Sequence, residues 1–342
     1  MGMNKKTIRN GLWLVLLVLG TVWILVRHNS PVPYQKNVGT IFGTLYAVTY
    51  QSRDDLQEDI ETALHRFDGS LSPFNDTSVI ARVNRNEPVV ADTLFANVFR
   101  RSRQVADETR GAFDITVAPL VNAWGFGFRD GAFPDSAMVD SLLRFTGYRK
   151  VRLDASGRIL KDDPRLMLTC SAVAKGYAVD VVAQLLSRKG VTSYMVDIGG
   201  EVVTRGLNPA GNPWRIGINK PEDDSLALGG ALQATLHVTD AAMATSGNYR
   251  NFYYRDGKKY AHTVDPRTGY PVQHEILSAT VLAPDCMSAD AYATAFMVMG
   301  LDSACRFVDA KDGLEAYFIY TDSAGQVRTW QSEGMGKYLD YK

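Results

Sequence analysis

Cysteine is scarce in this sequence, and neither sign of charge is in excess. The 342 residues include three cysteines, Cys170, Cys286 and Cys305, with no CxxC pair among them. An odd and sparse set excludes a disulfide framework and gives no sign of a zinc site. The 37 lysines and arginines balance 37 aspartates and glutamates. We therefore expect no nucleic acid as a partner.

Internal repeats and low-complexity segments are also lacking. With 46% hydrophobic and 22% charged residues, the composition is that of a folded globular protein and excludes a disordered or fibrous chain. Length alone favours about two domains. No change in composition marks an internal boundary, so we predict one compact domain over residues 39–342.

A long apolar run, Gly11–Val26, lies near the N-terminus. It approaches the ~20 residues that a membrane-spanning helix prefers. Neither the small-residue site of a cleaved signal peptide nor the cysteine of a lipoprotein signal follows it. Trp13 and Trp23 near its ends, with cations on both sides, are typical of interfacial anchors, although a buried helix would share the apolar pattern.

We therefore expect residues 1–28 to form an uncleaved membrane anchor and residues 29–38 to be a linker. Lys5, Lys6 and Arg9 precede the run and should stay in the cytoplasm. The domain that follows should then lie in the periplasm of a Gram-negative cell, attached to the inner membrane by one span.

Helices and strands alternate in the remainder without a regular βαβ pattern, which favours an α+β fold. Hydrophobic periodicity predicts helices at Asp55–Phe67, Asp92–Arg110, Ala172–Lys189, Ser288–Met299 and Leu301–Ala310. It predicts strands at Thr44–Tyr50, Tyr194–Arg205, Trp214–Asn219, Ala231–Val238 and Leu277–Leu282, with a closing pair that begins at Glu315–Tyr320.

Two helices carry residues suited to phosphate and metal binding. Lys175 lies in the first turn of one helix, where exposed N–H groups and a cation favour an anion. The spacing is not that of a Walker A loop, and a solvated lysine is the alternative. Asp290 and Thr294 are four residues apart and share a face of another helix. Their oxygens suit Mg²⁺, whereas Asp290 could instead stabilise the start of its own helix.

Three further segments contain unusual residues. Glycines among aromatics at 111–127 would allow a flat ligand to approach, or form a tight turn before core packing. The pair Gly199–Gly200 indicates either a bulge or a ligand contact. His262 is three residues before Asp265, which could orient it as a base, although such a histidine is often structural. Together these features are compatible with a nucleotide or flavin phosphate held on Mg²⁺.

Six ordered segments resemble the ApbE family of FAD:protein FMN transferases. They read GAFDITVAPLVNAWGFG, AVAKGYAVD, DIGGE, TSGNY, HTVDPRTGYPV and ADAYATAFMVMG. The resemblance spans roughly Gly39 to Gly300. It implies an ApbE-like fold and a Mg²⁺-dependent enzyme that cleaves FAD, attaches FMN to a threonine or serine of another protein and releases AMP. The implied acceptors are respiratory flavoproteins or secreted proteins with an FMN-binding domain.

The resemblance also assigns site residues. Those expected to contact FAD are Phe42, Phe74, Ala112, Phe113, Asp114, Thr169, Lys175 and Val264. Those expected to bind the metal are Asp290, Thr294 and, through its backbone carbonyl, Ala172. The sequence departs from the family at Phe42, where methionine is usual, at Phe74, where tyrosine is common, and at Thr169. Threonine keeps the oxygen of the usual aspartate there but not its charge.

We expect His262, oriented by Asp265, to take the acceptor's proton, and Asp290 to serve catalysis through the metal. Phe42, Phe74 and Phe113 would form the walls around the flavin. Two alternatives remain: a pyrophosphatase that converts FAD to FMN and AMP, and a non-catalytic periplasmic flavin-binding protein.

Overall fold

The computed structural model describes residues 12–21, 31–126, 133–221, 232–248, 252–255, 258–273 and 275–340. An eight-stranded sheet with the order β1-β2-β5-β6-β9-β12-β13-β14 is its centre, and all neighbours in it pair antiparallel. Its strands are β1 (Tyr34–Ile41), β2 (Thr44–Gln51), β5 (Tyr194–Ile198), β6 (Glu201–Arg205), β9 (Ala242–Gly247), β12 (Ile276–Ala283), β13 (Glu315–Thr321) and β14 (Val327–Gln331).

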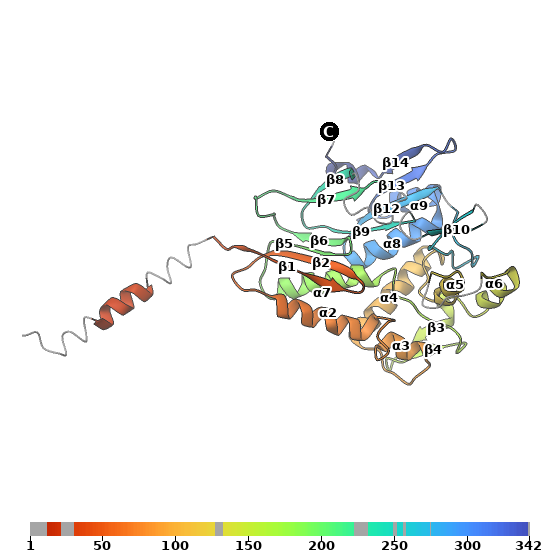
Figure 1. Ribbon diagram of the computed structural model, residues 1–342, viewed down its shortest axis with the longest axis horizontal. Helices are drawn as coiled ribbons and strands as arrows, with labels where there is room; N and C mark the ends of the chain where they lie inside the picture. Colours follow the sequence, from red (N-terminus) through yellow and green to blue (C-terminus); the bar gives the residue numbers. More distant parts are fainter. Residues whose placement is uncertain are drawn as a thin grey trace, which may run out of the picture.

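Three two-stranded hairpins and a set of helices complete the fold (Figure 1). The hairpins are β3 (Val151–Leu153) with β4 (Ile159–Lys161), β7 (Trp214–Asn219) with β8 (Leu232–Val238), and β10 (Phe252–Arg255) with β11 (Lys258–Ala261). The helices are α2 (Gln57–Leu71), α3 (Val79–Asn84), α4 (Thr93–Glu108), α5 (Ala118–Ala123), α6 (Ser136–Leu143), α7 (Ala174–Arg188), α8 (Cys286–Met299) and α9 (Leu301–Asp309).

The sheet has an apolar cluster on each face. Successive side chains of a strand point to opposite faces, so each strand contributes residues to both clusters. On β5, Val196 and Ile198 belong to the large cluster that includes α2, α7 and α8, whereas Met195 packs against the cluster under β7 and β8. Figure 1 shows α2 and α7 on one side of the sheet and β7 and β8 on the other. The helical layer therefore covers one face and a hairpin covers the other.

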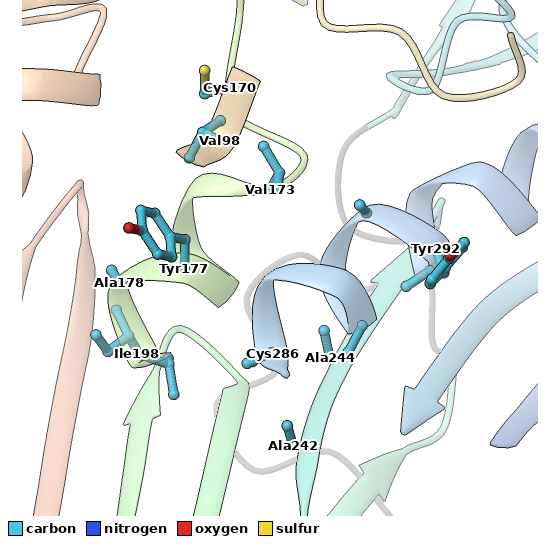
Figure 2. Packing of buried hydrophobic residues seen from close by; sticks show 14 of the residues in the cluster. Val98, Cys170, Val173, Tyr177, Ala178, Ile198, Ala242, Ala244, Cys286 and Tyr292 are labelled. Carbon is cyan, nitrogen blue, oxygen red and sulfur yellow. The ribbon is translucent and has the colours of Figure 1, made fainter. Parts of the chain in front are cut away.

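Helix α8 lies in the middle of the large cluster. Its residues are hydrophobic on all sides, the pattern of a helix buried all round, and 11 of its 14 residues are buried. Figure 2 shows Cys286 at its first turn, near Ala242 and Ala244 of β9, with Tyr177 on the neighbouring α7; Ile198 of β5 belongs to the same cluster. Small side chains thus let α7 and α8 approach each other and the sheet closely.

The α+β prediction is confirmed, with two local corrections. The expected linker is wrong from Tyr34 onward, because Tyr34–Ile41 is strand β1 and pairs along its whole length with β2. The predicted strand Tyr194–Arg205 is a hairpin, β5–β6. Its turn is Gly199–Gly200, with φ of 66° and 100°, so the expected bulge is a tight two-residue turn.

The predicted anchor falls mostly on residues outside the described ranges. Residues 12–21 form a helix whose side chains are largely exposed. Within the ranges that the structure describes, no helix has both the length and the apolar character needed to cross a membrane.

Candidate functional site

Helices α7 and α8 cap each other's N-termini. The carboxylate of Asp180 on α7 accepts hydrogen bonds from the backbone N–H groups of Cys286 (2.9 Å) and Met287 (2.8 Å) at the start of α8. In return, Oδ2 of Asp290 on α8 accepts a hydrogen bond from the N–H of Gly176 in the first turn of α7 (3.0 Å). Both helix starts leave N–H groups without intrahelical partners, so each carboxylate satisfies donors that would otherwise be buried unpaired.

Gly176 allows this contact. A Cβ at this position would lie 2.2 Å from the carbonyl oxygen of Cys286 and 2.8 Å from the Cβ of Asp290. Any side chain there would push the two helix starts apart. Gly176 thus lets Asp290 reach the start of α7. The preceding residue, Lys175, places a cation beside this contact.

Lys175 forms an ion pair with Glu201, the first residue of β6, with 2.6 Å between Nζ and Oε1. Burial alone would lower the pKa of Lys175, but the carboxylates of Glu201 and Asp290 raise it above its ordinary value. Burial raises the pKa of Glu201 to about 8, and the charge of Asp290 adds to this effect while Lys175 opposes it. Burial likewise raises the pKa of Asp290, against the effects of Lys175 and the Gly176 N–H.

This group contains one cation and two carboxylates, so it carries an excess negative charge when all three are ionised. Such an arrangement favours a second cation near Asp290, because buried charges are costly unless paired. The structure therefore supplies an electrostatic reason for a metal ion at this position.

The oxygens expected to bind a metal together with Asp290 lie on α8 and on the segment just before α7. Thr294, one turn further along α8, has its hydroxyl 3.1 Å from that of Ser246 on β9. The carbonyl of Ala172 precedes α7 and accepts no hydrogen bond from any described residue. A carboxylate, a hydroxyl and a carbonyl match the chemistry of Mg²⁺. No group of three or more His, Cys, Asp and Glu side chains in the described ranges is arranged to bind a metal, so a metal at Asp290 would need hydroxyl or carbonyl oxygens as further ligands.

Two of the expected flavin contacts lie at the edge of the helical layer. Phe42 is half-buried, with its ring centroid 5.4 Å from that of Phe67 on α2. It occupies the turn between β1 and β2 with a φ of 53°, a left-handed conformation that is unusual for phenylalanine. Phe74, which follows α2, is 79% exposed. Both rings are accessible to a ligand.

The third expected wall is wrong. Phe113 is 2% exposed and packs in the large core cluster, so its ring presents no face to a ligand. Its neighbours are interior as well: Ala112 is buried, and buried Asp114 accepts hydrogen bonds from Thr116 and from the N–H of Tyr148. The glycine and aromatic pattern of this segment reflects a tight turn entering the core. Any contact of residues 112–114 with FAD would therefore have to be made by their backbone.

The other expected contacts occupy different environments. Thr169 is half-buried and its hydroxyl lies 2.9 Å from that of Ser171, just before α7. It therefore lies on the same segment as Ala172 and Lys175. Val264 is 5% exposed and belongs to a separate apolar cluster with Leu120 and Trp124. A direct side-chain contact of Val264 with FAD stays a prediction.

Both carboxylate oxygens of Asp265 are engaged by another residue, and the expected orientation of His262 by Asp265 stays a prediction. Asp265 accepts two hydrogen bonds from the guanidinium of Arg267, at 2.9 and 2.8 Å, and one from the Arg267 N–H. The ring of His262 lies against Phe126, with centroids 6.4 Å apart. Its neighbour Thr263 donates a hydrogen bond to Asn248 just after β9 (2.6 Å), which holds the histidine segment beside the strand that carries Ser246.

Three important residues of this arrangement were not assigned from the sequence. Glu201 lies in the DIGGE segment that the sequence singles out, but its pairing with Lys175 spans 26 positions. Asp180 and Ser246 also lie in highlighted segments, with no local signal for their partners. The available sequence signal for Glu201 was its position, since it is an acidic residue directly after two glycines.

The fold is that of flavin transferases of known structure. The flavin transferase ApbE from Vibrio cholerae superposes with a TM-score of 0.80 at 33% identity, over 90% of this chain and all of that one. The apo form of the flavinyl transferase ApbE from Pseudomonas stutzeri gives a TM-score of 0.80 at 29% identity, over 91% of this chain and 98% of that one.

Comparison of sequences identifies the same kind of relative. A FAD:protein FMN transferase from Salmonella typhimurium is 35% identical over 314 residues, which covers 88% of each chain. The model of the ApbE family matches residues 42–318. The chain belongs to the ApbE family.

Proposed function

We propose that this protein transfers FMN from FAD to a threonine or serine hydroxyl of a flavoprotein, with Mg²⁺, and releases AMP. The observation that carries the proposal is that the buried carboxylates of Asp290 and Glu201 lie beside the partly exposed Lys175 at the start of α7. It combines a helix start, a cation and a carboxylate for a metal, which together suit a diphosphate. The names of the relatives support the same reaction class.

The reaction needs a defined exchange of bonds. The acceptor hydroxyl oxygen forms a bond to the phosphorus of the FMN half, and the bond from that phosphorus to the bridging oxygen breaks. AMP leaves with the bridging oxygen, and the hydroxyl proton passes to a base. Since phosphoryl transfer depends mainly on position and charge, the protein's main tasks are to hold the diphosphate and the attacking oxygen in line.

A placement in the fold supports each proposed role. Asp290, Thr294 and the Ala172 carbonyl would hold Mg²⁺, which neutralises charge on the diphosphate when bound. Lys175 is 34% exposed and would bind the same oxygens directly. His262, held beside the end of β9, is the proposed proton acceptor.

The proposal also covers flavin binding and the attachment of the protein to a membrane. Phe42 and Phe74 would stack on the isoalloxazine ring, Phe42 from a fixed turn and Phe74 from an exposed position. We further propose that residues 1–28 anchor the protein in the inner membrane with the catalytic domain in the periplasm. The apolar run in the sequence and its flanking cations support this placement.

Incubation of the full chain with FAD, Mg²⁺ and an FMN-binding acceptor domain tests the proposal. Mass spectrometry should find FMN on an acceptor threonine or serine and an equal amount of AMP. Free FMN and AMP with an unmodified acceptor would instead show a pyrophosphatase. Intact FAD after long incubation would show a binding protein without turnover.

A further inference from the structure

Glu201 combines deep burial with an incomplete set of partners. Its side chain is 2% exposed. Oε1 is paired with Lys175, but Oε2 is buried and has no hydrogen-bond partner among the described residues. Leaving a buried acceptor unpaired destabilises a fold, and more so when the group is charged. A carboxylate at this position is therefore not explained by the stability of the fold.

A rigid hairpin places this carboxylate. Glu201 pairs with Ile198 across the Gly199–Gly200 turn, and the N–H of Gly200 donates to Oδ1 of Asp197 (3.0 Å). Strand β6 then continues the central sheet to β9. Because the backbone is fixed on both sides, the carboxylate has little freedom to follow a moving lysine.

Lys175 has the opposite character. It extends from the first turn of α7, and a third of its side chain is exposed. The long lysine side chain has several rotatable bonds and loses considerable entropy when it is held in one position. The ion pair with Glu201 holds the ammonium from the interior, while part of the lysine side chain remains exposed where a ligand could approach.

We propose that Glu201 is a positioning residue that holds the Lys175 ammonium in the geometry required by the diphosphate in the transition state. Glu201 acts through Lys175 and does not itself touch the substrate, since its side chain is enclosed. The inference rests on the proposed function, because the diphosphate is the ligand that Lys175 would bind. It predicts that the contribution of Glu201 to the rate disappears when Lys175 is removed.

A double-mutant cycle in the full chain tests this coupling. The variants are Glu201→Gln, Lys175→Met and the combination, measured by covalent FMN on an acceptor domain with Mg²⁺. Each single change should lower kcat by about 10–100-fold, the usual effect of removing a group that orients a ligand-binding residue. KM for FAD should change much less in Glu201→Gln than kcat does. The combined variant should be no slower than Lys175→Met alone, because the two residues act as one unit.

Two further variants separate positioning from a structural role. Glu201→Asp keeps the charge and should recover more of kcat than Glu201→Gln. Asp322→Asn is the control: Asp322 lies in the turn between β13 and β14 and pairs with Arg328 at 3.0 Å, outside α7, α8 and β6. It should leave kcat within about twofold. The thermal midpoints of all variants show whether any loss of activity follows from loss of folding.

The outcomes are distinct. If the wild-type chain transfers FMN and the two single effects multiply in the combined variant, the positioning role is wrong and the proposed function stands. If Glu201→Gln is folded and transfers FMN at the wild-type rate, the positioning role is also wrong. If Glu201→Gln does not fold, the Glu201→Asp variant decides by the same comparison in the Lys175→Met background. If the wild-type chain gives no covalent FMN, both proposals fail.

Discussion

At the scale of single residues, Gly176 controls how closely α7 and α8 approach. Changing Gly176 to alanine would bring a methyl group to 2.2 Å from the carbonyl oxygen of Cys286. We expect the free energy of unfolding to fall by about 1–3 kcal/mol, the usual cost of overpacking. Metal-dependent transfer should fall too, because Asp290 would move away from the start of α7. Urea unfolding and transfer assays measure the two effects.

Gly69 provides the control for this prediction. It lies within α2, and an added Cβ there would meet nothing within 4 Å. Gly69→Ala should be neutral or stabilise the protein by up to about 1 kcal/mol, because alanine favours the helix. Equal stability of the two alanine variants would contradict the close helix contact.

The carboxylate of Asp290 is expected to be necessary for the response to Mg²⁺. Asp290→Asn keeps an oxygen that can accept the hydrogen bond from Gly176 but removes the charge. Transfer should then lose its dependence on Mg²⁺ and fall to background, and Asp290→Ala should do the same. A metal titration of the initial rate checks this. Full activity of a folded variant would remove Asp290 from the site.

His262 has a separate prediction. If it takes the acceptor's proton, His262→Ala should slow single-turnover transfer by ~10²–10⁴ while FAD binding is retained. Asp265→Asn should have a much smaller effect, since the carboxylate of Asp265 is paired with Arg267. An unchanged single-turnover rate in His262→Ala would assign the histidine a structural role.

At the scale of elements, local patterns predicted most helices and strands but not their partners. The spacing of Asp290 and Thr294 correctly placed both on one helix, because four residues make about one turn. The link from Asp290 to Gly176 spans 114 positions and depends on how α7 packs on α8, which local periodicity does not contain. The paired glycines Gly199–Gly200 indicated either a bulge or a ligand contact, because a two-residue turn between two buried strands gives the same local pattern.

The candidate site shows the same limit. Lys175 and Asp290 were found from helix position and spacing, and the family resemblance supplied Ala172. The pattern around Phe113 left ligand contact and core packing open, the resemblance implied an FAD contact, and the structure places the ring in the core. Glu201 was missed as a partner because pairing across 26 residues is decided by the β5–β6 hairpin and not by its own neighbours.

At the scale of the whole molecule, buried carboxylates should make stability depend on pH. Burial raises the pKa of Asp180 to about 7 and that of Glu201 to about 8. The folded protein therefore binds more protons than the unfolded chain between about pH 4 and 8, where unfolded carboxyl groups are ionised. It follows that the free energy of unfolding without metal falls as pH rises through this range, by on the order of a few kcal/mol.

Urea unfolding from pH 5 to 8 in the presence of EDTA measures this trend. Asp180→Asn should flatten the profile, since it removes one of the groups that take up protons on folding. Mg²⁺ should restore stability more strongly at pH 8 than at pH 5, because binding favours the ionised carboxylate of Asp290. A stability that rises steadily with pH in EDTA would contradict the burial of these charges.

The affinity of the full chain for FAD, measured with Mg²⁺ and again with excess EDTA, tests most directly whether one site binds the diphosphate through a divalent cation. Tight binding with Mg²⁺, strong weakening by EDTA and recovery on adding the metal back are expected, with no recovery in Asp290→Asn. The same affinity in EDTA as in Mg²⁺ would contradict the site built by α7, α8 and β6.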